Sequence, residues 1–388
     1  MKQNIYKSSK IRYMDNSFDA VIIGGGAAGL AAAVAYLRTG PRRRLVLLEA
    51  NEFCGRKLLA TGNGRCNISN LSAEGYSETK DFFKSIGVLF RLEDGGRAYP
   101  MSGQALSVRD ALVRALERER ADVRCGSCVA SLEKNDKGFE LRLEDGSVMY
   151  TEKALIATGG KAGPQYGCRG DGFAFARRLG HGIESIRPAL VPLVYAEEEK
   201  GRLSGLKGVR IRAQAELYIG GKRSAASSGE LQFTEYGLSG MMIFDISTMM
   251  PKSVIEGKPS VEVWLDLAPG EEQATLELLI RENEGLWLEG VVGRKLSELL
   301  VNEAGGDAAR VAELAKNFKV KISGTKGWKE AQATHGGVRF EEVDEKTGES
   351  LLCKGLFFAG EALEPVFICG GFNLNHAWIT GLRAGAHM

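Results

Sequence analysis

The sequence predicts an α/β fold in which a domain built on a parallel sheet is interrupted by an insertion. Three observations support this fold class. A β-branched apolar run at residues 20–23 is followed by three glycines and an Ala-rich helical pattern. Short alternating runs between residues 125 and 151 are typical of an antiparallel meander. The apolar run at 355–359, followed by a Gly and an acid, predicts a return to the first sheet after a long interval.

Length and composition limit the classes of protein that remain. A chain of 388 residues exceeds what one hydrophobic core usually organises, so two or three domains are expected. Lys and Arg (51) nearly balance Asp and Glu (49), which argues against nucleic acid as the main partner. Seven Cys without a dense framework predict free thiols in a reducing, cytoplasmic compartment. Residues 1–17 lack a signal-peptide pattern, so we expect a disordered tail.

The glycine-rich segment after the first strand predicts a dinucleotide site. Residues 20–37 are uncharged, but their strand, turn and helix order argues against a membrane span. Gly24, Gly26 and Gly29 form G-x-G-x-x-G, and Glu49 follows Gly29 by 20 residues. Such glycines permit a tight turn and close approach of the backbone to a pyrophosphate, and the acid binds a ribose diol. We assign Gly25, Ala27, Ala28 and Ala50 to the same site.

Later segments favour FAD over NAD as the resident dinucleotide. The loop at 55–70 is rich in Gly, Asn and cationic donors, which suits wrapping around an extended ligand. The meander, the strand end at 158–160 and the last strand at 355–361 resemble the flavoproteins related to glutathione reductase. That resemblance implies further FAD contacts from these segments: Arg56, Lys57, Gly62, Gly64, Cys66, Asn67, Val129, Thr158, Gly159, Gly160, Gly360, Glu361, Gly371, Phe372 and Asn373.

A narrower resemblance covers nearly the whole chain from residue 18. The segments GRKLLATGNGRCNISN, GELQFTEYGLSG, ATHGGV and GLFFAGEALEPVFICGGFNLNHAWITG, in this order, resemble the HI0933-like flavoprotein family. The resemblance implies a Rossmann-like FAD-binding domain at 18–187 and 336–388. It also implies an inserted domain at 188–335, with a small β-barrel at about 188–268 and 318–335 and a helical subdomain at about 269–317.

Candidate reactive groups are few. His335 and His376 lie at the return from the insertion and in the last helix, and either is a candidate proton donor because His titrates near neutrality. Hydrogen-bonded structural roles are the alternative for both. Arg65 is a candidate for orienting a substrate. Cys125 and Cys128 form C-x-x-C, but alternation in a strand puts them on opposite faces, so we expect packing. No Cys/His spacing of a metal site occurs, so no metal is expected.

These features predict an FAD-dependent oxidoreductase that transfers hydride between flavin and a small organic substrate. No second G-x-G-x-x-G follows a strand in residues 190–340, so NADH or NADPH would dock only transiently as donor. Two alternatives remain open: an oxygen-using amine oxidase, and a non-catalytic flavin-binding redox sensor or RNA-associated protein. The oligomeric state stays open as well.

Overall fold

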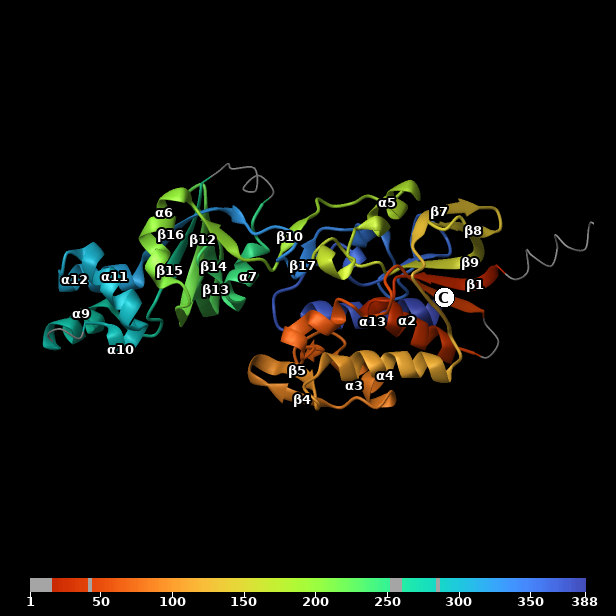
Figure 1. Cartoon of the computed structure of the whole chain (residues 1–388), viewed down its shortest axis with the longest axis horizontal. Coiled ribbons are helices and arrows are strands. Elements are labelled where there is room, and N and C mark those ends of the chain that lie inside the picture. Colours follow the sequence, from red (N-terminus) through yellow and green to blue (C-terminus); the bar gives the residue numbers. More distant parts are fainter. Residues whose placement is uncertain (1–15, 41–43, 252–259, 284–286) are drawn as a thin grey trace, which may run out of the picture. The chain divides into compact units, whose positions relative to one another are not determined.

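The structure, a computed structural model, describes residues 16–40, 44–251, 260–283 and 287–388 (Figure 1). The chain divides into two compact units, here called unit 1 (Met1–Ile186 with Ala333–Met388) and unit 2 (Arg187–Gln332). The domain boundaries expected from the sequence, after residues 187 and 335, lie one and three residues later than those of the structure, after residues 186 and 332. The expected tail at 1–17 lies outside the described residues except for its last two, and Ser17 already belongs to the first strand.

Unit 1 is built on a seven-stranded sheet with the order β6-β2-β1-β9-β8-β7, in which β18 also pairs with β9. The strands β6, β2, β1, β9 and β18 pair in parallel, whereas β7, β8 and β9 form an antiparallel meander. The bounds are β1 (Ser17–Ile23), β2 (Leu45–Glu49), β6 (Asp122–Cys125), β7 (Val129–Asn135), β8 (Gly138–Leu143), β9 (Val148–Ile156) and β18 (Leu356–Phe358). The α/β fold class with a meander is therefore confirmed.

Strand β9 corrects one detail of the sequence analysis, which treated the alternating runs up to residue 151 and the strand that ends at 158–160 as separate elements. The structure has one strand, because residues 150–156 pair continuously with β1. On its other side β9 pairs first with β8 and then with β18. The polar residues Glu152 and Lys153 lie where the neighbour changes, and they interrupt the apolar pattern without ending the strand.

The sheet is buried on both faces, as expected for parallel strands joined by helical crossovers. Along β1, Ala20 and Ile22 contribute to one core while Val21 and Ile23 contribute to the other. Helices α2, α3, α4 and α13 cover the first face, and α5 packs with the meander on the second (Figure 1). Their bounds are α2 (Ala27–Arg38), α3 (Tyr76–Ser85), α4 (Ala105–Arg118), α5 (Asp171–Arg178) and α13 (Phe372–His387).

Helices α2 and α13 approach each other closely because small residues line their contact. A Cβ on Gly381 would lie 2.3 Å from the carbonyl oxygen of Ala28, and a Cβ on Gly385 would lie 2.1 Å from that of Ala32. The four-residue spacing puts both glycines on one face of α13. The last helix is thereby fixed on the helix that follows the glycine-rich turn.

Smaller elements complete unit 1. An antiparallel sheet of order β3-β5-β4 lies apart from the main one in the pairing scheme. The strands of this sheet are β3 (Ser69–Asn70), β4 (Phe90–Glu93) and β5 (Arg97–Pro100). Strand β17 (Ala333–His335) lies outside it. The 3-10 helices described in unit 1 are η1 (Leu58–Gly64), η2 (Asp94–Gly96), η3 (Pro164–Tyr166), η5 (Phe340–Glu342) and η6 (Gly360–Ala362), and η4 (Ser204–Leu206) belongs to unit 2.

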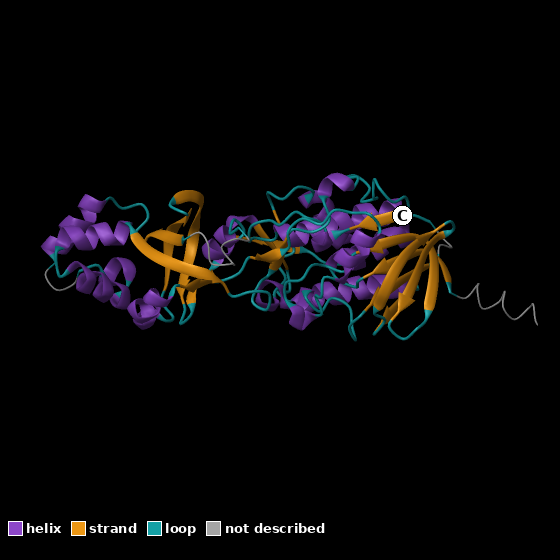
Figure 2. Cartoon of the chain, turned by 90° about the horizontal axis from the view of Figure 1, so that it is seen from above, coloured by secondary structure: helices purple, strands orange, loops and turns teal. Residues whose placement is uncertain are grey.

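Unit 2 contains a closed barrel of order β11-β14-β13-β12-β15-β16 and a group of helices (Figure 2). The barrel strands are β11 (Leu193–Tyr195), β12 (Arg210–Ile219), β13 (Lys222–Phe233), β14 (Gly237–Ser239), β15 (Val261–Asp266) and β16 (Phe318–Thr325), and β10 (Arg187–Ala189) lies outside the barrel. The helices are α6 (Glu197–Leu203), α7 (Met241–Ser247), α9 (Gln273–Glu282), α10 (Glu289–Val292), α11 (Arg294–Ala304) and α12 (Ala308–Lys316). Barrel and helices share one apolar core, so the expected barrel and helical elements are confirmed.

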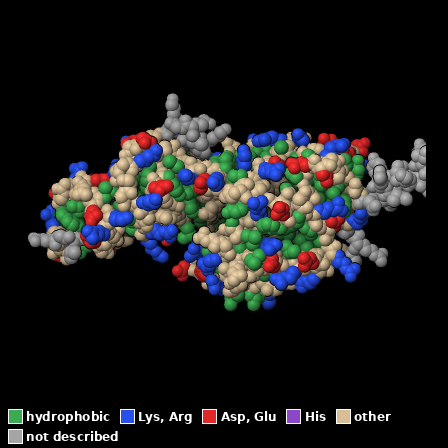
Figure 3. Space-filling model, viewed as in Figure 1, with side chains coloured by type: hydrophobic (Ala, Val, Ile, Leu, Met, Phe, Trp, Pro, Cys, Tyr) green, Lys and Arg blue, Asp and Glu red, His purple; other side chains and the backbone are tan. Residues whose placement is uncertain are grey.

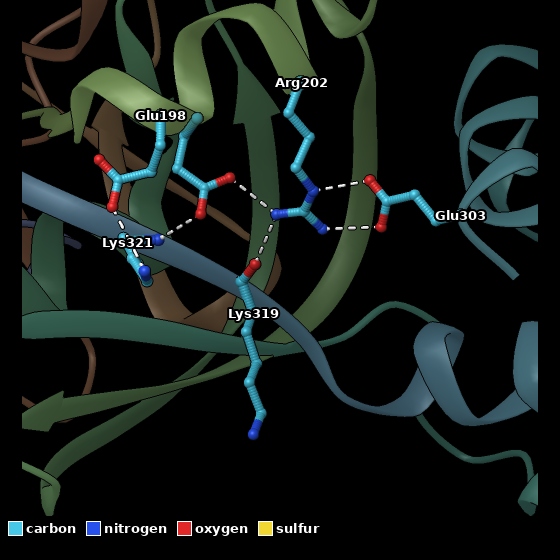
Figure 4. A network of polar contacts seen from close by, with 6 residues as sticks. Glu198, Arg202, Glu303, Lys319 and Lys321 are labelled. Carbon is cyan, nitrogen blue, oxygen red and sulfur yellow. Dashed lines mark hydrogen bonds and ion pairs between the residues drawn. The ribbon is translucent and has the colours of Figure 1, made fainter.

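Arg202 joins the barrel to the helices of unit 2 (Figure 4). Its guanidinium donates to both carboxylate oxygens of Glu303 at 2.6 and 3.0 Å, and to Glu199 at 2.7 Å. It also donates to the carbonyl oxygen of Lys319 at 2.8 Å and lies over the ring of Phe318. Because these partners use four of the five N–H groups of the guanidinium, we assign Arg202 a structural role.

No described helix is both long and apolar enough to cross a membrane. Within the same described residues, no group of three or more His, Cys, Asp or Glu is placed to hold a metal ion.

Candidate functional site

The glycine-rich turn after β1 combines closely packed glycines with one that faces open space. A Cβ on Gly24 would lie 2.4 Å from the carbonyl oxygen of Ala157, and the residue has φ +109°. A Cβ on Gly29 would lie 1.9 Å from the carbonyl oxygen of Gly24. At Gly26, by contrast, an added Cβ would meet nothing within 4 Å. The turn therefore packs tightly against the sheet and exposes its middle to a ligand.

The N-terminus of α2 opens onto the same space. Gly26 is the N-cap residue and no side chain caps the helix, so its first N–H groups have no side-chain acceptor. Ala28 is buried against the last helix, while Ala27 is partly exposed. Free N–H donors and the helix dipole together favour a phosphate at such a position.

Glu49, at the end of β2, is buried yet keeps acceptor capacity. Its Oε2 accepts the Gly25 N–H at 2.8 Å. Its Oε1 accepts from the backbone and side-chain nitrogens of Asn51, at 2.8 and 2.6 Å. An ionised carboxylate has about four acceptor positions, so one remains for a hydroxyl group. Asn51 was missed by the sequence analysis; its only signal was its place two residues after the acid. Ala50 lies exposed between them.

A second cluster forms where the chain returns at β17 and β18. Glu361 Oε2 accepts from Lys57 Nζ at 2.7 Å, and Oε1 accepts the backbone N–H of Thr334 at 2.9 Å. Thr334 Oγ1 accepts from the N–H groups of Lys161 and Ala162 at 2.7 and 3.0 Å. Burial lowers the pKa of Lys57, but Glu361, Cys168 and Tyr166 together raise it, and the net pKa is above the usual value. Lys57 therefore stays charged beside Glu361.

The glycines of this cluster are required by close contacts. A Cβ on Gly160 would lie 2.2 Å from Thr334 Oγ1, and one on Gly360 would lie 2.9 Å from the Cβ of Ala28. Thr158, which follows β9, lies beside Gly24, and Gly159 has φ +72° with open space around it. Thr334 is a second residue that the sequence analysis missed.

The residues of the loop at 55–70 that were expected to contact the ligand differ in what surrounds them. Asn67 Oδ1 is buried and has no hydrogen-bond partner among the described residues, and it lies near Gly371. The Cys66 side chain is buried in the core, where burial raises the pKa of the thiol to about 12. Arg56 is exposed and donates to Asn51 at 3.0 Å. Gly62 and Gly64 lie exposed on the same loop.

Arg65 is already engaged by protein groups. Its guanidinium forms an ion pair with Glu93 and lies 4.2 Å above the centre of the Tyr99 ring. Its side chain is 39% exposed, so one side remains open to a ligand. The structure thus gives Arg65 a structural partner that its sequence context did not indicate.

The start of α13 holds the remaining expected contacts. Gly371 has φ +102°, and a Cβ there would lie 2.3 Å from the carbonyl oxygen of Ser69. The side chain of Asn373 binds the backbone N–H and carbonyl of Phe367, at 3.0 and 2.8 Å, and so fixes the preceding loop. Phe372 begins the helix with its ring beside Gly370. Val129 is different: it is a buried core residue at the start of β7.

His376 lies in an aromatic environment, one turn into α13. Its ring centre is 5.2 Å from that of Phe367 and 6.4 Å from that of Phe340. Its Nε2 is buried and has no hydrogen-bond partner among the described residues. Burial, aided by the charge of Arg383, lowers the pKa of His376 to about 4. The ring is therefore neutral at pH 7. His335 lies half-buried in β17.

Comparison with known proteins decides the family. A family model described as the HI0933-like protein Rossmann domain matches residues 75–387. The chain belongs to the HI0933-like family. A 3-dehydro-bile acid delta(4,6)-reductase from Clostridium scindens is 35% identical over 94% of this chain and 97% of its own length. A ribosomal RNA dihydrouridine synthase from Escherichia coli is 28% identical over 93% of this chain and 95% of its own length.

Solved structures show the same architecture. A 3-ketosteroid-delta4-(5alpha)-dehydrogenase from Rhodococcus jostii, in complex with 4-androstene-3,17-dione, superposes with a TM-score of 0.53 at 16% identity. It matches 96% of this chain and 97% of its own, a likeness of fold alone. Family, fold and relatives together identify this HI0933-like protein as an FAD-dependent oxidoreductase.

The residues described above fit FAD. The open space at Gly26 and the uncapped N-terminus of α2 suit its pyrophosphate. The remaining acceptor position of Glu49 suits a ribose hydroxyl. The buried, unpartnered Oδ1 of Asn67 suits a ring N–H, because a buried acceptor without a donor is costly. In contrast, the side chains of Cys66, Val129 and Asn373 are occupied by packing or by the chain's own backbone.

The C-x-x-C spacing does not indicate which groups Cys125 and Cys128 contact. Cys125 is exposed at the end of β6, and its Sγ lies 3.8 Å from the Sγ of Cys54. Cys128 is half-buried, and its sulfur lies 3.8 Å from Nη1 of Arg169. Cys125 thus faces a thiol from a loop 71 residues earlier.

Proposed function

We propose that this HI0933-like protein is a reductase that adds two hydrogens across a carbon–carbon double bond conjugated to a carbonyl group. The substrate we propose is a small, largely apolar molecule, and the donor NADH or NADPH. One observation carries the proposal: the relative named as a 3-dehydro-bile acid delta(4,6)-reductase matches nearly the full length of both chains at 35% identity. When bound, FAD supplies the group that accepts a hydride from the donor and gives it to the substrate.

Transient docking of the donor is supported by the topology of unit 2. Its described barrel strands are antiparallel and closed, whereas a resident nicotinamide domain is built on a parallel sheet. The seven cysteines are all free thiols, which supports a reducing, cytoplasmic setting.

Side chains of this protein supply the other requirements of the reaction. Reduction of a conjugated double bond requires a proton at the carbon next to the carbonyl, and a hydrogen bond to the carbonyl oxygen stabilises the charge that develops there. A group with a pKa of about 4 is deprotonated at pH 7, so His376 suits a neutral N–H donor better than a proton source. We therefore propose His335 for the proton and Arg65 for orienting the substrate.

The same chemistry on RNA is a second candidate. The Escherichia coli relative is named as a ribosomal RNA dihydrouridine synthase, and the 5,6 double bond of uridine is likewise conjugated to a carbonyl. The charge of the chain favours a small-molecule substrate over RNA. The net charge of the whole chain is +2. Acidic and basic side chains are interspersed over the visible face in Figure 3, whereas RNA-binding surfaces are usually basic.

The test is anaerobic and follows flavin absorbance. Mixing the protein with NADH or NADPH should bleach the flavin, and a 3-oxo-Δ4 steroid acid should then restore its absorbance under nitrogen. Restoration by a uridine-containing ribosomal RNA transcript alone would establish the second candidate. Bleaching by an amine, with reoxidation by oxygen only, would replace both by the amine oxidase.

A further inference from the structure

Two thiols from separate elements face each other beside the dinucleotide turn. Cys125 Sγ lies 3.8 Å from Cys54 Sγ, close to the contact distance of two sulfur atoms. Cys125 ends the edge strand β6 and is exposed, whereas Cys54 is 5% exposed in the loop after β2. A disulfide needs a sulfur–sulfur distance of about 2.05 Å, so side-chain rotation with a small backbone adjustment would join them.

Both thiols contact the groups that surround the ribose-binding acid. In the sheet register Cys125 is the partner of Glu49. A Cβ on Gly25 would lie 2.6 Å from Cys54 Sγ, so this sulfur packs directly against the glycine that donates to Glu49. The N–H groups of Gly126 and Ser127 donate to the carbonyl oxygens of Asn51 and Glu49, both at 2.8 Å.

We propose that Cys54 and Cys125 form a peroxide-sensitive dithiol whose oxidation to a disulfide weakens FAD binding. The inference concerns modification of the thiols and does not depend on the substrate proposed above. It assigns a chemical role to Cys125 that its C-x-x-C spacing with Cys128 does not indicate.

The reaction balances with hydrogen peroxide as oxidant. The exposed Cys125, as thiolate, attacks one peroxide oxygen; the O–O bond breaks and the other oxygen leaves as water after protonation. Cys125 is then a sulfenic acid. The Cys54 sulfur attacks the Cys125 sulfur, the S–O bond breaks, and the departing hydroxide takes the Cys54 proton to form a second water. The two thiols lose two electrons and peroxide gains them; a dithiol reductant reverses the change.

Burial explains the order of these steps. Burial raises the pKa of the Cys54 thiol well above its usual range, and the proximity of Cys125 raises it further. The thiolate is the nucleophile in such reactions, so the exposed Cys125 reacts first and Cys54 resolves the sulfenic acid.

Coupling to FAD follows from the position of Cys54. Bond formation draws its sulfur toward β6 and away from Gly25, and so disturbs the 2.8 Å bond from Gly25 N–H to Glu49. By linkage, bound cofactor should in turn disfavour the disulfide at equilibrium, because the coupling free energy between two sites is reciprocal.

The first experiment maps the thiols. Wild-type protein is treated with hydrogen peroxide, free thiols are alkylated, and the digest is analysed by mass spectrometry without reduction. We expect a peptide pair linked through residues 54 and 125 that dithiothreitol releases. Cys125→Ser should abolish it, and the matched control Cys128→Ser should leave it intact. A linkage between residues 125 and 128, or alkylation of both Cys54 and Cys125 after peroxide, would overturn the proposal.

The second experiment measures binding rather than activity. Apoprotein in the oxidised and reduced forms is titrated with FAD by flavin fluorescence. We expect the Kd of the oxidised wild type to be about five-fold higher or more, within the usual range of coupling between sites. The Kd of Cys125→Ser should not respond to peroxide. Equal Kd values for a wild type shown to carry the 54–125 linkage would refute the coupling to FAD.

Discussion

Lys57 and Glu361 form an ion pair, with Nζ 2.7 Å from Oε2, although 304 residues separate them. Lys57 belongs to the donor-rich loop after β2, and Glu361 follows β18, after the chain has returned to unit 1. The second oxygen of Glu361 accepts the N–H of Thr334, which lies at the same return. One carboxylate thus joins the two sequence segments of unit 1 at the edge of the sheet where the dinucleotide turn lies.

Glu361→Gln should lower the free energy of unfolding of the apoprotein by about 1–3 kcal/mol. The side chains are 26% and 25% exposed, which places the loss between that of a surface pair and that of a buried pair. Urea denaturation monitored by circular dichroism measures it. Because Glu361 holds the pKa of Lys57 above its usual value, the pair's contribution should persist up to about pH 10 and fall at higher pH.

A double-mutant cycle separates this pair from its surroundings. Lys57→Met, Glu361→Gln and the double variant should show a coupling free energy of about 1 kcal/mol or more. Strict additivity of the two single changes would show that the ion pair contributes nothing.

Glu49→Ala should weaken FAD binding by about 1–3 kcal/mol, because a ribose hydroxyl and the Gly25 and Asn51 donors lose their acceptor. Titration of apoprotein with FAD measures the change. Glu52→Ala, three residues later and exposed, is the matched control and should bind like the wild type. Wild-type affinity in Glu49→Ala would remove this residue from the cofactor site.

Gly381→Ala and Gly385→Ala should each destabilise unit 1 by about 1–3 kcal/mol, because the new methyl group meets backbone oxygens of α2 at 2.3 and 2.1 Å. Thermal denaturation gives the comparison. Gly201→Ala is the control: it lies in helix α6 with nothing within 4 Å of its added Cβ, and there the change should stabilise by about 0.5–1 kcal/mol. Stable variants at 381 and 385 would show that the two helices separate at little cost.

The parts of the site that were predicted from sequence are those encoded by short-range spacing. Gly24, Gly26, Gly29 and Glu49 form a local pattern, because strand, turn, helix and next strand follow one another within the 33 residues from Ser17 to Glu49. The return at β18 was also predicted, since Glu361 follows an apolar run with a glycine between. In each case a few neighbouring residues determine both the backbone geometry and the chemistry.

What the sequence did not reveal depends on contacts between distant segments. Thr334 meets Lys161 across 173 residues, and Cys125 meets Cys54 across 71. These distances are set by strand order and register, which local spacing does not encode. Arg65 shows the same effect: its cationic side chain indicated a ligand contact, but the β4–β5 hairpin supplies Glu93 and Tyr99 as partners.

His376 should make the stability of unit 1 depend on pH between about 4 and 6.5. Its pKa is about 4 in the folded protein, chiefly through burial, and about 6.5 when unfolded. In this window the unfolded chain binds more protons, so the free energy of unfolding rises with pH. The difference amounts to at most about 3.5 kcal/mol, for 2.5 pKa units at about 1.4 kcal/mol each.

His376→Gln, which does not titrate, should flatten this part of the curve. Urea denaturation at several pH values from 4 to 7 measures the slope, and a constant offset from altered packing against Phe340 and Phe367 does not affect it. Glu74 and Arg383 are the charged groups that influence the ring, and both are unchanged in the variant. His387→Gln, at the exposed end of the same helix, is the control and should keep the wild-type slope. If His376→Gln keeps that slope as well, the ring of His376 is protonated as readily in the folded chain as in the unfolded one, and its assignment as a neutral hydrogen-bond donor at the site fails with it.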